Sequence, residues 1–156
     1  MADRRMGQVR IALEPIGFVS TEYAEEGSKK RTDSVVSRIV LKKKYTKGLR
    51  GIEGYSHLFV LYYMHKVEKS ERSQLLTRPK HRKELPEVGI FSTRQRNHPN
   101  PIGLTLVELL RHEANTLQVK NLDAFDGTPV LDIKPCNHRD IPRKIRLPSW
   151  WLRSQS

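Results

Sequence analysis

The sequence predicts an all-β protein, a small closed β-barrel of about six or seven strands with short helical connections. Three observations support this fold class. Short apolar or β-branched segments recur along the chain, turn-forming residues separate them, and no amphipathic helix of three turns is present. With 156 residues, the chain can build one hydrophobic core but not two independent ones.

The first half of the chain contains three strand-like segments. Residues 11–19 form the first, and the proline and glycine inside it indicate an edge or a bend. Residues 35–41 are rich in β-branched side chains and predict the second strand. The basic piece that follows, 42–50, favours one or two helical turns. Residues 58–64 are a continuous apolar run, which predicts a strand buried on both faces.

The second half begins with the most polar stretch, 68–87, which lacks periodicity and predicts a long exposed loop. Two antiparallel strands follow at 105–110 and 116–122, joined at 113–115.

A turn signal, Asp126-Gly127, then leads into a last strand at 129–133. We expect residues 1–142 to form the barrel domain and 143–156 a basic tail with two tryptophans.

The charge balance indicates a polyanionic partner. Lysine and arginine number 29 against 17 acidic residues, giving a net charge of +12 and a pI near 10.1. Phosphates neutralised by such side chains release counterions, which makes nucleic acid the favoured partner. An anionic membrane surface is the alternative, but the sequence has no amphipathic anchor.

Other features narrow the class of protein. The one cysteine, Cys136, excludes an internal disulfide, and there is no Cys/His cluster at zinc spacing. We therefore expect no metal and a reducing, cytoplasmic setting. The apolar runs are too short to cross a bilayer, and the N-terminus lacks the apolar stretch of a signal peptide.

The most informative stretch is 89–110, where seven polar residues precede a proline-bracketed asparagine and a strand pattern. The prolines stiffen the loop that carries Arg94, Arg96 and His98. Gly103 allows either an unusual backbone conformation or the close approach of a ligand. The segment is either a rigid loop for an anionic or polar ligand or a stiffened surface turn.

A second dense cluster is FDGTPVLDIKPC at 125–136. The period of a strand places Val130, Asp132 and Lys134 on one face. The aspartate and the lysine either form a simple ion pair, which is the default interpretation, or orient a substrate amine or a ribose hydroxyl.

Three segments together resemble one family. They are GIEGYSHLFVLYYMH (51–65), GIFSTRQRNHPNPIGLTLVEL (89–109) and DGTPVLDIKP (126–135). In order and spacing they resemble the TsaA-like, or TrmO, family, and the opening IGFVSTEY (16–23) is similar to the family's first strand and turn. The likeness spans roughly residues 16–135.

This resemblance implies a small β-barrel that binds S-adenosylmethionine without a Rossmann fold, and the sequence has no glycine-rich strand–loop–helix unit. It also implies a homodimer. The implied activity is methyl transfer to N6 of threonylcarbamoyladenosine, next to the anticodon of tRNA. The alternatives are a non-catalytic module that binds S-adenosylmethionine or RNA, and a methyltransferase of the same fold with a different acceptor.

Carried onto this sequence, the resemblance implies a set of site residues. The catalytic candidates are Asp132 and Lys134, and proton acceptors would be Asp132, His65 or solvent. The cofactor would be bound by His65, Lys66, Thr93, Arg94, His98, Asn100, Asp126, Gly127, Thr128 and Pro129. Independently of the resemblance, the basic charge of the polar stretch predicts that RNA is bound by Arg72, Arg78, Lys80 and Arg82, the alternative being a solvated loop.

The sequence departs from the family pattern at two points. In the loop, Gln95-Arg96 replaces Ser-Pro and His98 stands where the family has arginine, and Cys136 replaces the tyrosine of D-I-K-P-Y. Histidine carries its charge only part of the time near neutral pH. Our hypothesis is that Arg96 reaches the same anion.

Overall fold

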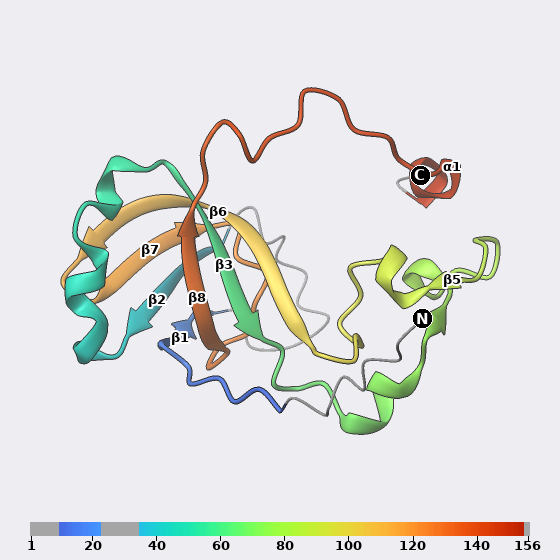
Figure 1. Cartoon of the computed structure of the whole chain (residues 1–156), viewed down its shortest axis with the longest axis horizontal. Coiled ribbons are helices and arrows are strands. Elements are labelled where there is room, and N and C mark those ends of the chain that lie inside the picture. Colours follow the sequence, from blue (N-terminus) through green and yellow to red (C-terminus); the bar gives the residue numbers. More distant parts are fainter. Residues whose placement is uncertain (1–9, 23–34, 155–156) are drawn as a thin grey trace, which may run out of the picture.

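Six antiparallel strands close into a barrel in the computed structural model, which describes residues 10–22 and 35–154 (Figure 1). Around the barrel the order is β1-β2-β7-β6-β3-β8, and β8 pairs with β1 to close it. The strands are β1 (Gly17–Ser20), β2 (Val36–Leu41), β3 (His57–Tyr63), β6 (Ile102–Glu113), β7 (Thr116–Lys120) and β8 (Pro129–Pro135). The predicted fold class is confirmed.

The first strand is shorter than the sequence predicts. Only Gly17–Ser20 is a strand, because these residues find partners in β2 and β8. Ile11 and Leu13, which the prediction included, are exposed. Tyr23, the last residue of the family-like opening segment, lies outside the described residues.

The apolar run on β3 is not buried on both faces, as we expected from its composition. Leu58, Val60 and Tyr62 point into the barrel and are buried, whereas the alternate residues are only half-buried. An antiparallel barrel has one interior, so alternate positions must face outward. The outward row of β3 joins exposed leucines on β6 to form an apolar outer face.

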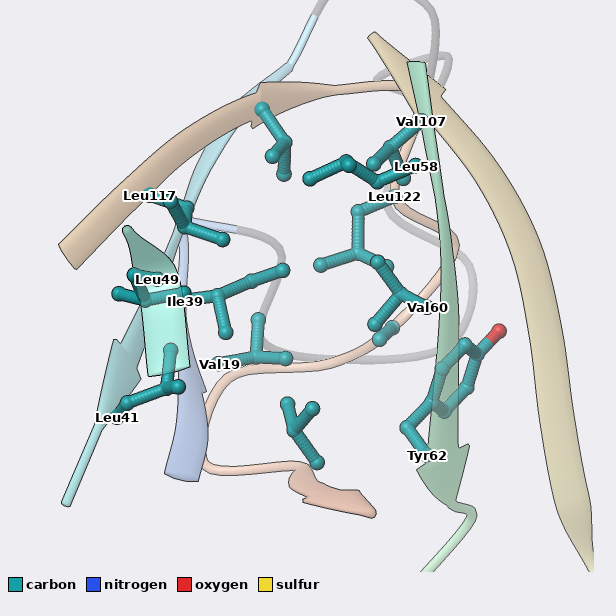
Figure 2. Close-up of a cluster of buried hydrophobic side chains, with 13 residues drawn as sticks. Val19, Ile39, Leu41, Leu49, Leu58, Val60, Tyr62, Val107, Leu117 and Leu122 are labelled. Carbon is teal, nitrogen blue, oxygen red and sulfur yellow. The ribbon is translucent and has the colours of Figure 1, made fainter. Parts of the chain in front are cut away.

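Aliphatic side chains from all six strands and their connections meet inside the barrel (Figure 2). Tyr62 is the one aromatic member of this buried cluster, and its hydroxyl points away from the aliphatic side chains (Figure 2). Tyr62 is paired with Gly103 across β3 and β6, and a Cβ on Gly103 would overlap the tyrosine ring. The missing side chain at Gly103 therefore makes room for the Tyr62 ring and not for a ligand.

The polar stretch after β3 is a folded insertion and not the long exposed loop that we expected. It contains a two-stranded sheet of β4 (Leu76–Thr77) and β5 (Val88–Gly89), with the short 3₁₀ helices η4 (Lys69–Ser73), η5 (Pro79–His81) and η6 (Ile90–Ser92). Val67, Pro79, Leu85 and Ile90 are buried. A few apolar residues without periodicity thus suffice to order it, and it projects from the barrel beside the start of β6 (Figure 1).

The other helices are short. The basic piece after β2 forms the expected turns as η2 (Lys43–Leu49), followed by η3 (Ile52–Gly54). After β8 the chain is exposed from 137 to 149 and runs clear of the barrel to α1 (Ser149–Ser154) (Figure 1). Among the residues that the structure describes, none of the helices could cross a membrane.

The turn at Asp126-Gly127 does not make a hairpin. Gly127 has a φ of 74°, as its turn requires, but β8 pairs with β1 and β3 and not with the preceding β7. The turn is held against β1, because the Gly127 N–H donates to the carbonyl of Val19 at 2.9 Å.

We predict that Gly103→Ala lowers the free energy of unfolding by about 1–3 kcal/mol, because the new methyl group displaces the buried Tyr62 ring. Gly54→Ala is the matched control, since nothing lies within 4 Å of an added Cβ there. Denaturant unfolding of both variants measures the difference, and equal midpoints would contradict the packing role of Gly103.

Candidate cofactor-binding site

A cavity of about 1180 Å³ lies at one end of the barrel, where β3 and β7 end and β6 begins. The insertion forms one side of this cavity and the barrel forms the other. Its lining includes four cationic side chains (Lys66, Lys80, Arg94, Arg96), two carboxylates (Glu71, Asp123) and three histidines (His65, His81, His98).

The loop after η6 is tied down on the insertion side of the cavity. The Thr93 N–H and hydroxyl both donate to the carbonyl of Ile90, at 3.0 and 2.8 Å. His98 Nε2 lies 3.2 Å from the Thr93 carbonyl oxygen, and Arg94 donates to the carbonyl of Leu104 on β6. The proline-bracketed loop is thus held from both ends.

An ion pair joins this loop to η4. Arg96 lies 3.2 Å from Glu71, and both side chains line the cavity and are partly exposed. Glu71 also accepts a hydrogen bond from the N–H of Glu68 in a capping box. Our hypothesis is that Arg96 reaches the anion that the family's arginine would bind. In this structure the Arg96 guanidinium contacts the carboxylate of Glu71, in the wall of the cavity.

The barrel side of the cavity is formed by residues 121–125, which connect β7 to β8. The buried Tyr62 hydroxyl donates to the carbonyl of Asp123. The Thr105 hydroxyl lies 3.1 Å from the same Tyr62 hydroxyl. Burial raises the pKa of Tyr62, so the phenol remains a neutral donor near pH 7. The Asp123 backbone is fixed in this way while its residue stays exposed in the cavity.

The chain leaving β3 completes this wall. Lys66 Nζ lies 4.7 Å from the centre of the Phe125 ring, a cation–π contact that joins the two segments of this wall. The pKa of His65 is lowered, first by partial burial and then by the charge of Lys66. His65 is therefore largely neutral at pH 7 and has a nitrogen lone pair available.

The structure brings together six of the ten residues predicted to bind the cofactor. The cavity is lined by His65, Lys66, Thr93, Arg94, His98 and Thr128. Residues of the proline-bracketed segment and residues on either side of the Asp126-Gly127 turn thus line one cavity, as the family resemblance implies.

The other four residues do not line this cavity. Asp126 and Gly127 hold the turn against the chain near β1, where the Asp126 carboxylate accepts from the N–H of Thr21 at 2.9 Å. Pro129 starts β8 opposite Phe18. The Asn100 carbonyl accepts from the Ile102 N–H at 2.7 Å, and the Asn100 side chain is exposed.

Asp132 and Lys134 also lie away from the cavity. They form a largely exposed ion pair of 2.8 Å on β8. A bulge at Leu131 breaks the expected common face, so Val130 is buried in the barrel while Asp132 borders a smaller hollow at the opposite end. This geometry matches the ion-pair interpretation.

The four residues predicted to bind RNA have different surroundings. Arg72 is partly buried and donates to the Tyr63 hydroxyl and the Val67 carbonyl. Arg78 donates to the Leu85 carbonyl, and Arg82 pairs with Glu84. Of the four, only Lys80 lines the cavity.

Several lining residues were not singled out in the sequence. Among them are Tyr62, Glu71, Thr105, Asn121 and Asp123. Asp123 lies three residues before the Asp126-Gly127 turn, so the turn signal could have drawn attention to it. The positive φ of Asn121, 66°, was not apparent from the sequence.

Of the two departures from the family pattern, only the one in the loop, with Gln95, Arg96 and His98, is at the cavity. The Cys136 N–H donates to the carbonyl of His57. His57 is the first residue of β3, and the cavity lies at the other end of that strand. In the described residues no group of three or more His, Cys, Asp or Glu side chains could hold a metal ion.

These features define a class of protein. A closed antiparallel barrel with a large cavity at one end, lined by charges of both signs and an aromatic ring, is a β-barrel ligand-binding domain. The family model for the tRNA-methyltransferase O N-terminal domain matches residues 21–140. The chain belongs to this TrmO family.

Individual relatives agree with this membership. An S-adenosyl-L-methionine-binding protein from Archaeoglobus fulgidus is 42% identical over 127 residues, which cover 80% of this chain and 88% of that protein. The tRNA (adenine(37)-N6)-methyltransferase of Mus musculus is 34% identical over 133 residues, 80% of this chain but 30% of that protein. The crystal structure of TrmO from Pseudomonas aeruginosa has a TM-score of 0.71 at 28% identity and covers 88% of this chain. The chain spans 62% of that TrmO chain.

Proposed function

We propose that this protein is an S-adenosylmethionine-dependent tRNA methyltransferase. The observation that carries the proposal is the cation-lined cavity at the end of a TrmO-family barrel. Relatives named for S-adenosyl-L-methionine binding and for tRNA methylation support the cofactor and the reaction class.

The residues of the cavity fit this cofactor. Arg94 and Lys80 offer charge to its carboxylate, Glu71 and Asp123 offer charge to its ammonium group, and Phe125 offers a ring face to its adenine. The volume of about 1180 Å³ exceeds that of most single-ligand pockets, which leaves room for an acceptor base. When bound, the cofactor supplies a methyl group already activated on a sulfonium.

The acceptor that we propose is N6 of threonylcarbamoyladenosine next to the anticodon. Such a base is unpaired and can enter a pocket at modest cost. The net charge of +12 favours RNA, and the cations of the cavity suit the carboxylate of a threonyl group. A tRNA substrate also implies a cytoplasmic protein.

Asp123 is the residue that we propose as the proton acceptor. The acceptor nitrogen must lose its N–H proton as it gains the methyl carbon, and a carboxylate within the cavity can take that proton. Asp123 is exposed to the cavity, and its backbone is fixed by Tyr62. Glu71 is the other lining carboxylate but is paired with Arg96, and Asp132 is outside the cavity.

We further propose that the protein acts as a homodimer through the apolar outer face of β3 and β6. Phe59 and Leu61 face outward on β3 beside Leu106 and Leu104 on β6. Leu104 also lines the cavity, so a second copy on this face would lie beside the site.

An assay of methyl transfer tests the proposed function. With labelled cofactor, we expect label in bulk tRNA that carries the threonylcarbamoyl group and none in tRNA that lacks it. Label in both pools would indicate a different acceptor. Cofactor binding without transfer to any tRNA would instead favour a non-catalytic binding module, a function suggested by the names of the archaeal relatives.

We expect Asp123→Asn to lower kcat by about 100-fold or more, because the amide cannot accept the proton. The Kd for the cofactor should change much less. Asp126→Asn is a matched control, since it makes the same substitution three residues away and outside the cavity. A variant at Asp123 with wild-type kcat would remove this residue from the reaction.

Leu106→Glu should convert the dimer to a monomer, because it places a charge in the centre of the proposed apolar face. Val36→Glu on β2, where Val36 is similarly exposed, should leave the dimer intact. Sedimentation analysis gives the masses, and a monomeric wild-type protein would contradict the proposed assembly.

A further inference from the structure

An aromatic side chain is displayed to solvent beside the cavity. Phe91 in η6 is 76% exposed, the highest value among the large apolar side chains that the structure describes. Displaying a phenyl ring in water forgoes its favourable burial. The ring packs edge-on against His98, with centroids 5.7 Å apart and planes at 73°. Since His98 lines the cavity, Phe91 stands at its rim.

The exposure of Phe91 is imposed by a well-anchored backbone. Its neighbour Ile90 is 1% exposed and lies in the core of the insertion. The Ile90 N–H donates to the carbonyl of Leu75 at 2.9 Å, and the Ile90 carbonyl accepts from Thr93. With the backbone fixed on both sides and the ring packed against His98, the ring is presented in a defined position, which lowers the ordering entropy lost on binding.

The charges around Phe91 indicate what this ring could bind. His98 and the cations Lys80, Arg94 and Arg96 line the adjoining cavity. An aromatic ring beside cationic side chains is the arrangement that binds single-stranded nucleic acid, because bases stack on the ring while phosphates meet the cations.

We propose that Phe91 is a stacking platform for an unpaired tRNA base adjacent to the nucleotide that enters the cavity. This inference rests on the proposed function, because it takes tRNA as the substrate. Phe91 would hold the neighbouring base outside the cavity and so set the depth to which the target nucleotide enters.

The test compares Phe91→Ala, Phe91→Tyr and the control Leu75→Ala, which removes an exposed aliphatic side chain from the same insertion. The probe is a labelled anticodon stem-loop RNA, whose Kd is measured by fluorescence anisotropy at several salt concentrations. Loss of one base stack should weaken binding by Phe91→Ala about 5- to 150-fold. Phe91→Tyr and Leu75→Ala should bind within about threefold of wild type, because each keeps a ring at position 91.

Two further readouts separate stacking from other roles. The slope of log Kd against log salt should be the same for Phe91→Ala and wild type, since no charge is removed. The Kd for S-adenosylmethionine and the molecular mass of Phe91→Ala should also be unchanged. An altered mass would assign the ring to contact between copies of the chain and would overturn the proposal.

If Phe91→Ala binds the RNA as tightly as the wild-type protein does, the stacking proposal is overturned, even if the wild-type enzyme methylates tRNA. Conversely, if no tRNA is methylated but RNA binding still depends on the ring at position 91, the proposed function fails and the stacking role stands. The two failures are therefore distinguishable.

Discussion

The hydrogen bond from the Tyr62 hydroxyl to the Asp123 carbonyl connects the barrel core to the wall of the cavity. The tyrosine ring is part of the buried cluster, and its position depends on the missing side chain at Gly103. The hydroxyl end leaves that cluster and fixes the segment that presents Asp123 and Phe125. Core packing and site geometry are thus coupled through one side chain, because the ring cannot shift without moving a wall of the cavity.

The barrel end supplies only half of the site, and the insertion between β3 and β6 supplies the other half. Its ends are continuous with two barrel strands that pair with each other, so the insertion is held at the barrel end by its connections. The Glu71–Arg96 ion pair and the hydrogen bond from Arg94 to Leu104 then tie the charged loop to η4 and to β6. Cations from the insertion therefore face a carboxylate and an aromatic ring from the barrel.

Much of this architecture could be predicted from the sequence, because β-branched segments and turn residues report local conformation directly. The strands of the barrel follow from such signals, whereas the meeting of the two motif segments at one cavity was implied by the family resemblance. The bulge at Leu131 could not be predicted, because pairing register depends on the partner strands, and it moves Asp132 away from the expected face. The insertion was misjudged because four buried apolar residues scattered in a polar stretch leave no periodic pattern. Asp123 was missed because its importance depends on a contact with Tyr62, 61 residues earlier in the chain.

At its start, β6 lines the cavity with both of its faces. Gly103 and Thr105 point inward, where the Tyr62 ring and hydroxyl constrain them, while Ile102 and Leu104 point outward and are about half exposed. Only the inward pair is subject to the packing demands of the barrel interior. Substitutions at the outward pair can therefore reshape the binding surface at little cost in folding energy. In this strand the determinants of ligand preference and of stability alternate residue by residue, so a related barrel could acquire a new ligand without redesigning its core.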